Sequence, residues 1–488
     1  MILLLLLAVP ALGALLVAFL PDRVARCAAV AVSAVTFGLS LGPLTGRHPA
    51  HHVVDPWRSV DFAWIPGLNV RFQLGVDGIS WPLVVLTTLL VLLCALYSLK
   101  NVPAPGRAPT MLALLLVLET GVLGTFLALD AVLFFVFFEV TLAPMFALIA
   151  IWGGPRRRHA ARKFLLYTLF GSVLLLVGIL LITVKSGTAS IAELSARGGS
   201  GLSHGTQLAA FALLLVAFAV KSPLWPLHTW LPDAHTEAPT VGSVLLAGVL
   251  LKMGTYGLIR LGLPVLPEGA RAFAPLIGVL AVAAIIAGSL ICLVQDDLKR
   301  LIAYSSVGHM GFVLLGVATL TAAGIQAALI GNIAHGVLTG LLFFLAGALK
   351  DRYGTGSLAR LGGLGSASPR LAGLLGFAAI GSLGLPGLAG FWGEAFAVIA
   401  SWQRGGLFVV LAVVAAIGAA VTAAYFLRML RLVVSSPAPV PSLAGPSAGE
   451  LVAWVPLVAL ALAIGVWPAL VLAVTSTPVD ALVRAVTR

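Results

Sequence analysis

The sequence predicts an all-α polytopic membrane protein with about fourteen transmembrane helices. Of its 488 residues 60% are hydrophobic and only 9% are charged, whereas an average soluble domain carries about a quarter charged residues. Apolar stretches of about eighteen or more residues, the length that crosses a bilayer, recur along the whole chain. The mean hydropathy of +1.11 agrees with them. Soluble folds cannot bury this much apolar surface, so we expect the helices to face lipid.

Short polar or basic turns separate the apolar segments and set the limits of the predicted spans. We place these spans at 1–20, 24–44, 78–99, 110–129, 131–152, 163–184, 207–228, 239–261, 272–295, 300–320, 325–349, 371–399, 406–432 and 451–474. The first span lacks the basic start of a signal peptide, and Pro21 and Asp22 turn it directly into the second span. We therefore expect it to be a permanent helix.

The longest predicted loop covers residues 45–76. Its tryptophans, Trp57 and Trp64, suit a membrane interface. Its histidines, His48, His51 and His52, have no cysteine or carboxylate at ligand spacing, so we expect them to be solvated rather than bound to a metal.

The Lys and Arg residues of the loops predict the orientation in the membrane. Seventeen of the 29 fall on the side that holds the loops after odd-numbered spans, and ten fall on the other side. Because cytoplasmic loops carry the excess of positive charge, the run from Arg156 to Lys163 is expected in the cytoplasm. Both termini are then expected on the opposite side of a bacterial-type cell membrane.

Two predicted spans contain helix-breaking residues. Span seven ends in a Pro-rich run at 221–226, and span twelve contains a Gly-rich run at 381–387 with a proline. The runs lie five spans apart, and because five is odd, a five-helix unit repeated at this distance would be inverted in the membrane. The alternative is that the prolines only kink helices that face lipid. The repeat divides the chain into helices 1–3 with the long extracytoplasmic loop (1–109), a first repeat (110–261), a second repeat (272–432) and helix 14 (451–474).

Five ionisable residues fall inside the predicted spans: Glu119, Glu139, Lys221, Lys252 and Glu394. Four of them, all except Glu119, together cost on the order of 10–14 kcal/mol in a bilayer before any pairing. Intramembrane charges usually mark ion or proton paths, although each acid could instead pair with a lysine to hold helices together. Glu119 has no evident partner, and both interpretations stay open for it.

Polar residues on spans ten and eleven extend this group: Tyr304, Ser305, Ser306, His309, Asn332 and His335. Imidazoles and hydroxyls can hold water and pass protons. The two serines could equally bond their own helix backbone, so we favour His309 and His335 as relay residues. Asp130, Asp296 and Asp297 flank spans and are expected to be helix caps or loop pairs.

Several kinds of partner are not expected. The net charge of +12 would suggest nucleic acid in a soluble protein, but here the basic residues lie in short loops beside membrane spans. The three cysteines, Cys27, Cys94 and Cys292, form no paired motif, which argues against zinc or iron–sulfur ligation. The chain also has no glycine-rich nucleotide loop. We therefore expect no cofactor and no redox centre in this chain.

Several motifs resemble the antiporter-like subunits of respiratory complex I. They are HTWLPDAHTEAPT at 228–240 with LLKMGTYG at 250–257, FQLGVDGIS at 72–80, FFEVTLAPM at 137–145, AYSSVGHMGF at 303–312 and GLPGLAGFWGE at 384–394. A glutamate at 394 and the absence of a long C-terminal lateral helix resemble the subunit M type, the counterpart of mitochondrial subunit 4. The motifs span most of the chain.

The resemblance implies fourteen helices with two inverted five-helix repeats and discontinuous helices 7 and 12. It implies a proton relay through Glu139, Lys221, Lys252 and Glu394, with His309 and His335 as secondary members. In that family FMN, iron–sulfur clusters and quinone belong to partner subunits, and the neighbours are other antiporter-like membrane subunits.

Three alternatives remain beside this interpretation. A subunit of a multisubunit cation/proton antiporter or of an energy-converting hydrogenase would share the architecture. A purely structural membrane anchor would not need four buried charges and two broken helices.

Overall fold

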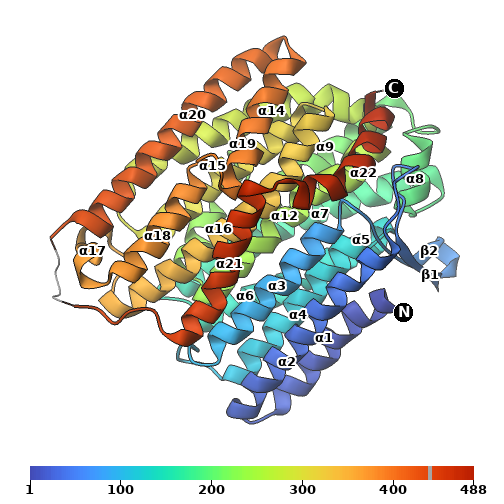
Figure 1. Ribbon diagram of the computed structural model, residues 1–488. Helices are drawn as coiled ribbons and strands as arrows, with labels where there is room; N and C mark the ends of the chain where they lie inside the picture. Colours follow the sequence, from blue (N-terminus) through green and yellow to red (C-terminus); the bar gives the residue numbers. More distant parts are fainter. Residues whose placement is uncertain (438–441, 488) are drawn as a thin grey trace.

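The computed structural model describes residues 1–437 and 442–487, and it is an elongated bundle of helices that lie side by side (Figure 1). Within the described residues fourteen helices are long and apolar enough to cross a membrane. The predicted all-α membrane fold is thus confirmed. The set of fourteen differs from the predicted one in a single member: the two halves of the broken span twelve are each too short to be included, and a second C-terminal helix, Ala469–Thr487, is included instead.

The helices of the first half follow the predicted spans closely. They are α1 (Ile2–Phe19), α2 (Asp22–Leu41), α3 (Trp81–Ser98), α4 (Ala108–Leu127), α5 (Ala131–Val140), α6 (Leu142–Trp152), α7 (Arg157–Ser186), α8 (Ile191–Arg197), α9 (His204–Lys221), α10 (Trp230–Glu237), α11 (Thr240–Leu245), α12 (Leu251–Gly257) and α13 (Leu263–Val265). Two π-helical segments, η3 (Leu246–Leu250) and η4 (Leu258–Gly262), join α11 to α13 into one continuous crossing. This crossing, residues 240–265, is the most deeply buried of the bundle.

The second half contains the longest helix of the described chain. Its elements are α14 (Pro267–Leu293), α15 (Leu298–Ala318), α16 (Ala322–Tyr353), η5 (Leu358–Arg360), α17 (Leu364–Ala367), α18 (Pro369–Ser382), α19 (Ala389–Arg404), α20 (Leu407–Leu430), η6 (Arg431–Ser435), α21 (Ala448–Val466) and α22 (Ala469–Thr487). Helices α15 and α16 are almost entirely buried, so they form the centre of this half together with residues 240–265.

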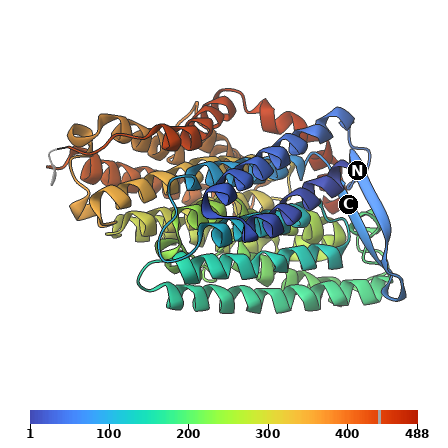
Figure 2. The same ribbon diagram turned by 90° about the horizontal axis from the view of Figure 1, so that it is seen from below.

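The predicted loop 45–76 contains a β-hairpin instead of being irregular throughout. The 3₁₀ turn η1 (Gly42–Gly46) precedes this region. The strands β1 (Arg58–Ile65) and β2 (Val70–Val76) pair antiparallel, and the 3₁₀ turn η2 (Pro66–Leu68) connects them. The hairpin stands at one end of the bundle (Figure 2). We call this end the hairpin face, and we call the opposite end, which carries residues 153–163, the arginine face.

Both predicted helix breaks are present. Helix α9 ends at Lys221 and the chain becomes helical again only at Trp230, because Pro223 and Pro226 lack the backbone N–H that a helix needs. The predicted end of span seven at residue 228 is therefore wrong, since α10 continues the crossing to Glu237. In span twelve, residues 383–388 separate α18 from α19. The sequence analysis missed a further interruption at Thr141, between α5 and α6.

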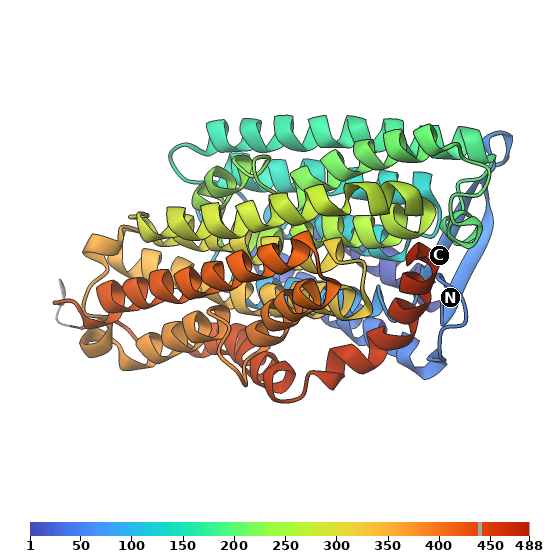
Figure 3. The same cartoon turned by 90° about the horizontal axis from the view of Figure 1, so that it is seen from above.

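The C-terminal span predicted at 451–474 is present as α21, but its predicted end is wrong. Helix α21 ends at Val466, and Trp467 leaves the helical conformation because the residue before a proline is pushed toward extended backbone. After Pro468, α22 runs across the helix ends at the hairpin face instead of alongside the other helices (Figures 1 and 3). The Arg47 side chain donates a 2.5 Å hydrogen bond to the Ala473 carbonyl and holds α22 there.

Two equivalent backbone bridges support the predicted inverted repeat. Asp130 pairs with Ser190, and Asp297 pairs with Ser357, so each partner in the second bridge stands 167 positions after its counterpart in the first. Both aspartates accept N-cap hydrogen bonds, at α5 and at α15. Burial raises the pKa of the Asp130 carboxyl, although three backbone N–H groups bond it. Five crossings separate the bridges, which therefore lie on opposite faces. The repeat and its limits, 110–261 and 272–432, stay predictions.

Candidate functional site

Four of the five charged residues predicted inside the spans, all except Glu119, lie along one line through the middle of the bundle, and they are buried or partly buried. The line begins at α5 and α9 in the first half and ends at α19 in the second half. The wholly buried crossing 240–265 lies between these ends. The side chains are therefore shielded from bulk water and able to act on one another strongly.

Glu139 and Lys221 are neighbours at the start of the line. The Ser172 hydroxyl on α7 donates a hydrogen bond to the Glu139 carboxylate. The Lys221 ammonium, only 3% exposed, donates to the Thr141 hydroxyl at 3.4 Å and lies 4.6 Å from the centre of the Phe138 ring. The two side chains make no direct ion pair in the described part of the chain. Each uses a hydroxyl partner instead.

The broken end of α9 packs directly on the helix that carries Lys252. The Ser222 hydroxyl donates to the carbonyl of Leu251 at 3.2 Å. Gly254 makes this approach possible, because a Cβ atom there would overlap the Ser222 hydroxyl oxygen. The residues next to Lys221 and Lys252 in the chain are therefore in direct contact.

Lys252 opens a continuous set of contacts into the second half of the bundle. Its ammonium is fully buried and donates to the Ala247 carbonyl, five residues back across the π-helical segment η3. Its Nζ also lies 2.5 Å from Nδ1 of His335, within hydrogen-bond distance. The rings of His335 and His309 lie 5.8 Å apart, and Nδ1 of His309 lies 2.7 Å from a carboxylate oxygen of Glu394. Four of the predicted residues thus form one line.

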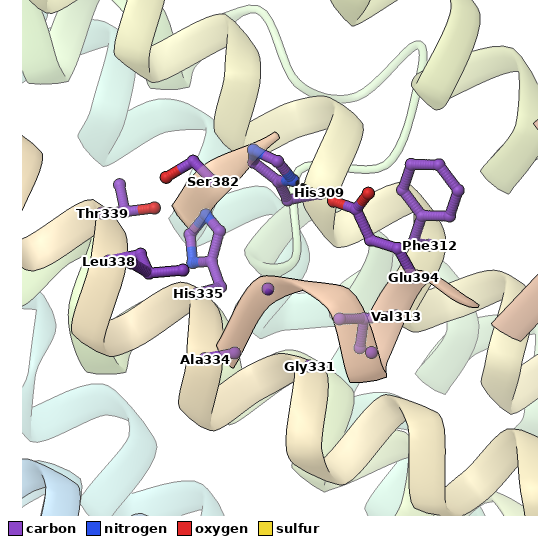
Figure 4. A pocket seen from close by; sticks show the side chains of 12 residues that line it. His309, Phe312, Val313, Gly331, Ala334, His335, Leu338, Thr339, Ser382 and Glu394 are labelled. Carbon is purple, nitrogen blue, oxygen red and sulfur yellow. Dashed lines mark hydrogen bonds and ion pairs between the residues drawn. The ribbon is translucent and has the colours of Figure 1, made fainter. Parts of the chain in front are cut away.

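A cavity of about 30 Å³ lies where this line ends. His309, His335, Glu394, Ser382 and Thr339 contribute its polar lining. Figure 4 shows the His309 ring and the Glu394 carboxylate facing each other, with His335 close by. Nε2 of both histidines lacks a hydrogen-bond partner within the described chain. The volume suffices for about one or two water molecules, which polar walls of this kind can bind.

The other polar residues of spans ten and eleven have structural contacts. Ser305 and Ser306 both donate to the carbonyl of Ile302, at 2.8 and 3.1 Å, so their hydroxyls bond their own helix. Asn332 and Thr255 bond each other at 3.0 and 3.1 Å and tie α16 to α12. These residues hold the helices around the line without lying in it.

Glu119 is completely buried on α4, apart from this line. Neither of its carboxylate oxygens has a hydrogen-bond partner among the residues that the structure describes. An isolated ionised carboxylate is very costly in an apolar interior, so Glu119 is expected to be protonated. Both interpretations of its role stay open.

A buried ion pair was not among the predicted site residues. Arg260 lies in η4 with 2% of its side chain exposed. It bonds both carboxylate oxygens of Asp77, at 2.6 and 2.7 Å, and its Nε donates to the Tyr256 hydroxyl at 3.2 Å. Lys252, Tyr256 and Arg260 follow at intervals of four residues, a spacing that places them on one helix face. This spacing indicates from the sequence alone that Arg260 lies on the same helix face as the buried Lys252.

His235 was also missed as an individual residue. It lies within the HTWLPDAHTEAPT motif, is completely buried on α10 and stacks on Phe343 with ring centres 4.4 Å apart. Neither ring nitrogen has a partner in the described ranges. A second histidine of the motif, His228, lies in the turn before α10 and packs edge-on against Tyr304, with ring centres 6.2 Å apart. The motif thus places two imidazoles at the broken helix, outside the line.

The cysteines and the loop histidines lie apart from the line. Cys94 and Cys292 are buried and free, and Cys27 is exposed on α2. Within residues 1–437 and 442–487 no three His, Cys, Asp or Glu side chains are grouped to hold a metal ion.

A helical membrane fold with discontinuous helices and a buried row of lysine, histidine and glutamate defines the class of antiporter-like membrane subunits. Residues 128–418 match the family described as "NADH:quinone oxidoreductase/Mrp antiporter, TM". NADH-quinone oxidoreductase subunit M of Rhodobacter capsulatus is 41% identical over 463 residues, which cover 92% of this chain and 88% of that protein. The chain belongs to the NADH:quinone oxidoreductase/Mrp antiporter family, as an antiporter-like subunit of the subunit M type.

Solved structures agree with this assignment. A chain of respiratory complex I from Thermus thermophilus, solved with bound NADH, superposes with a TM-score of 0.90 at 30% identity, and the match covers 100% of both chains. A chain of the Mrp complex from Dietzia sp. DQ12-45-1b shares the fold, with a TM-score of 0.86 at 24% identity over 100% of this chain and 99% of that one.

Proposed function

We propose that this chain is a proton-translocating membrane subunit of an NADH:quinone oxidoreductase. It moves protons through the buried row of Glu, Lys and His side chains, and this movement is coupled to quinone reduction in other subunits. One observation carries the proposal: Lys252, His335, His309 and Glu394 come from four different helices and lie in succession. A structural ion pair needs only two of them.

The contacts suit the transfer of protons. Nζ of Lys252 lies 2.5 Å from Nδ1 of His335, the geometry in which an ammonium can hand its proton to an unprotonated imidazole nitrogen. His309 is hydrogen-bonded to Glu394, and the cavity beside both rings has the volume for the water needed to cross the 5.8 Å between them. Each residue of the row can hold a proton and pass it on.

The packing favours a sideways path from Lys252. Between Lys252 and the hairpin face, Tyr256 and the Arg260–Asp77 ion pair fill the same helix face. A fixed ion pair cannot readily accept a further proton. The contact with His335 is therefore the available route for a proton that leaves Lys252. We propose that Lys221 accepts a proton from the arginine face, that Lys252 and the histidines relay it, and that Glu394 releases it toward the hairpin face.

The bias of basic residues supports an arginine face in the cytoplasm. Arg260 on the hairpin side and Lys299 on the other side are both buried, and without them nine Lys and Arg residues remain on the hairpin side against sixteen on the other. Both chain ends lie near the hairpin end (Figures 2 and 3), which agrees with the predicted location of the termini outside a bacterial-type cell membrane.

We propose that the partners are the neighbouring antiporter-like subunits and other membrane subunits of the complex. The similarity to a chain of complex I from Thermus thermophilus supports this assembly. FMN, iron–sulfur clusters and quinone then belong to other subunits, and this chain carries no redox centre of its own. The enzyme activity, that of a translocase, belongs to the complex.

The experiment compares NADH-driven proton pumping and quinone reductase activity in inverted membrane vesicles. Lys252→Met removes the charge that contacts His335 and should reduce pumping severely. Lys350→Met removes a lysine from the exposed end of α16 and should leave pumping unchanged. Full pumping by Lys252→Met would contradict the proposal. Pumping that disappears in sodium-free buffer would favour the cation antiporter alternative.

A further inference from the structure

The Ser172 hydroxyl on α7 differs from many other buried hydroxyls of the crossings in its hydrogen-bond partner. Those hydroxyls donate to a carbonyl of their own helix three or four residues back, as serine and threonine commonly do in membrane helices. Thr168, one turn before Ser172, bonds the Phe164 carbonyl in this way at 2.7 Å. Ser172 instead donates to the Glu139 carboxylate on α5. Its hydroxyl therefore acts between helices.

Close packing of α7 on α9 places Ser172 beside the broken helix. Gly171 lets the two helices approach, because a Cβ atom there would lie only 3.3 Å from Cβ of Val220 and 3.4 Å from the Ala217 carbonyl oxygen. Ser172 follows Gly171, and Lys221 follows Val220 as the last residue of α9. Ser172 thus lies where α5, α7 and α9 meet, near both charged residues of the first half.

A second hydroxyl serves Lys221. The Thr141 hydroxyl donates to the Phe138 carbonyl at 2.8 Å, so it can only accept from the Lys221 ammonium 3.4 Å away. In the described part of the chain Glu139 and Lys221 form no ion pair. Two neutral side chains therefore satisfy a carboxylate and an ammonium that lie near enough to act on each other.

We propose that Ser172 is a positioning residue for Lys221 and acts through Glu139. This inference rests on the proton path proposed above. The Ser172 hydroxyl stabilises the ionised carboxylate, because a hydrogen bond to the charged form favours that form. It also occupies the carboxylate, so that Glu139 does not bond the Lys221 ammonium directly. The negative charge stays close enough to attract a proton to Lys221, and the direct ion pair that would retain this proton is avoided.

The second half of the chain has a hydroxyl at the corresponding position. Thr339 stands 167 positions after Ser172, the spacing that also relates the two backbone bridges. Thr339 lies on α16 and lines the cavity that Glu394 also lines. Each half thus places a hydroxyl near a glutamate of the buried row, which supports a role of this position in the row.

The test begins with Ser172→Ala in the assembled complex. The carboxylate loses its donor, and an unsatisfied buried carboxylate is costly, so it should turn to the Lys221 ammonium. A cryo-electron microscopy structure of the variant should show a Glu139–Lys221 ion pair. NADH-driven pumping in inverted vesicles should fall about tenfold or more, because one hydrogen bond to a charged group changes an equilibrium by at least this factor. An immunoblot of the vesicles checks that the chain is present in native amount.

Three matched variants test the hydroxyl itself. Ser172→Thr keeps it and should pump near the native rate. Ser172→Cys keeps nearly the size of serine but offers only a weak donor, so it should pump as poorly as Ser172→Ala. Thr168→Val removes a buried hydroxyl one turn away with little change of shape, and it should leave pumping unchanged because that hydroxyl bonds only its own helix.

Several results would overturn the proposal. Native pumping by Ser172→Ala would do so, as would a carboxylate that stays apart from Lys221 in the structure of this variant. Full pumping by Ser172→Cys, or none by Ser172→Thr, would indicate a packing role instead. Lys221→Ala in the same vesicles separates the two proposals. If it loses pumping while Ser172→Ala retains it, only the role of Ser172 is wrong; if it pumps at the native rate, the proton path is wrong and this inference with it.

Discussion

The Asp77–Arg260 ion pair makes the sharpest prediction about stability. Asp77→Asn keeps an oxygen for the backbone N–H groups of Ile79 and Ser80 but removes the charge opposite Arg260. Two hydrogen bonds of 2.6 and 2.7 Å to a charged group are each worth about 1.5–3 kcal/mol. Breaking one side of a buried pair costs about 3–5 kcal/mol, which is in the same range. We expect Asp77→Asn to lower the free energy of unfolding by about 3–5 kcal/mol.

The assay is titration of the purified chain with sodium dodecyl sulfate, followed by tryptophan fluorescence. Adding Arg260→Met to Asp77→Asn should recover at least half of the loss, because the unpaired buried cation is then gone. A loss below about 1 kcal/mol for Asp77→Asn would refute the reasoning. A double variant no more stable than the single one would refute it as well.

Three further predictions concern the helix ends and the row of charges. Asp297→Ala removes the N-cap of α15 and should lower the unfolding free energy by about 1–2 kcal/mol in the same titration; no change would contradict the cap. Gly254→Ala places a Cβ atom against the Ser222 oxygen and should cost about 1–3 kcal/mol, whereas Gly376→Ala, which meets open space, should not. Glu394→Gln keeps the shape of the contact with His309 but not its charge, and should reduce NADH-driven pumping in vesicles; pumping at the native rate would remove Glu394 from the row.

The fold could be predicted largely from local signals. Apolar length fixes the spans, and prolines or glycines inside an apolar segment mark the broken helices at 221–226 and 381–387. Pro468 likewise indicated the break before α22. The prediction placed no break there because the residues on both sides of Pro468 are apolar. The predicted end at residue 474 is wrong because hydropathy alone does not reveal that a proline interrupts the helix.

The site could be predicted only as a set of residues, because pairing is not local. The free-energy cost of a charge in the membrane identified Lys252 and Glu394 from the sequence. The sequence does not show that His335 and His309 lie between them in the structure. Arg260 shows the same limit, since its partner Asp77 lies 183 residues away. The Lys221 ammonium bonds the hydroxyl of Thr141, at the interruption between α5 and α6. Pro144 was a local signal for this interruption, because its missing N–H leaves the Val140 carbonyl without a helical partner.

NADH-driven proton pumping by Lys221→Ala, measured in inverted vesicles beside quinone reductase activity, tests the central claim most directly. Lys221 is buried at the break of α9, which packs on the helix that carries Lys252, the first residue of the contacts that lead to Glu394. We predict that pumping is lost and that electron transfer slows with it, because the two are coupled. Unchanged pumping, in membranes where this complex is the sole NADH-linked pump, would contradict a proton path through the buried row.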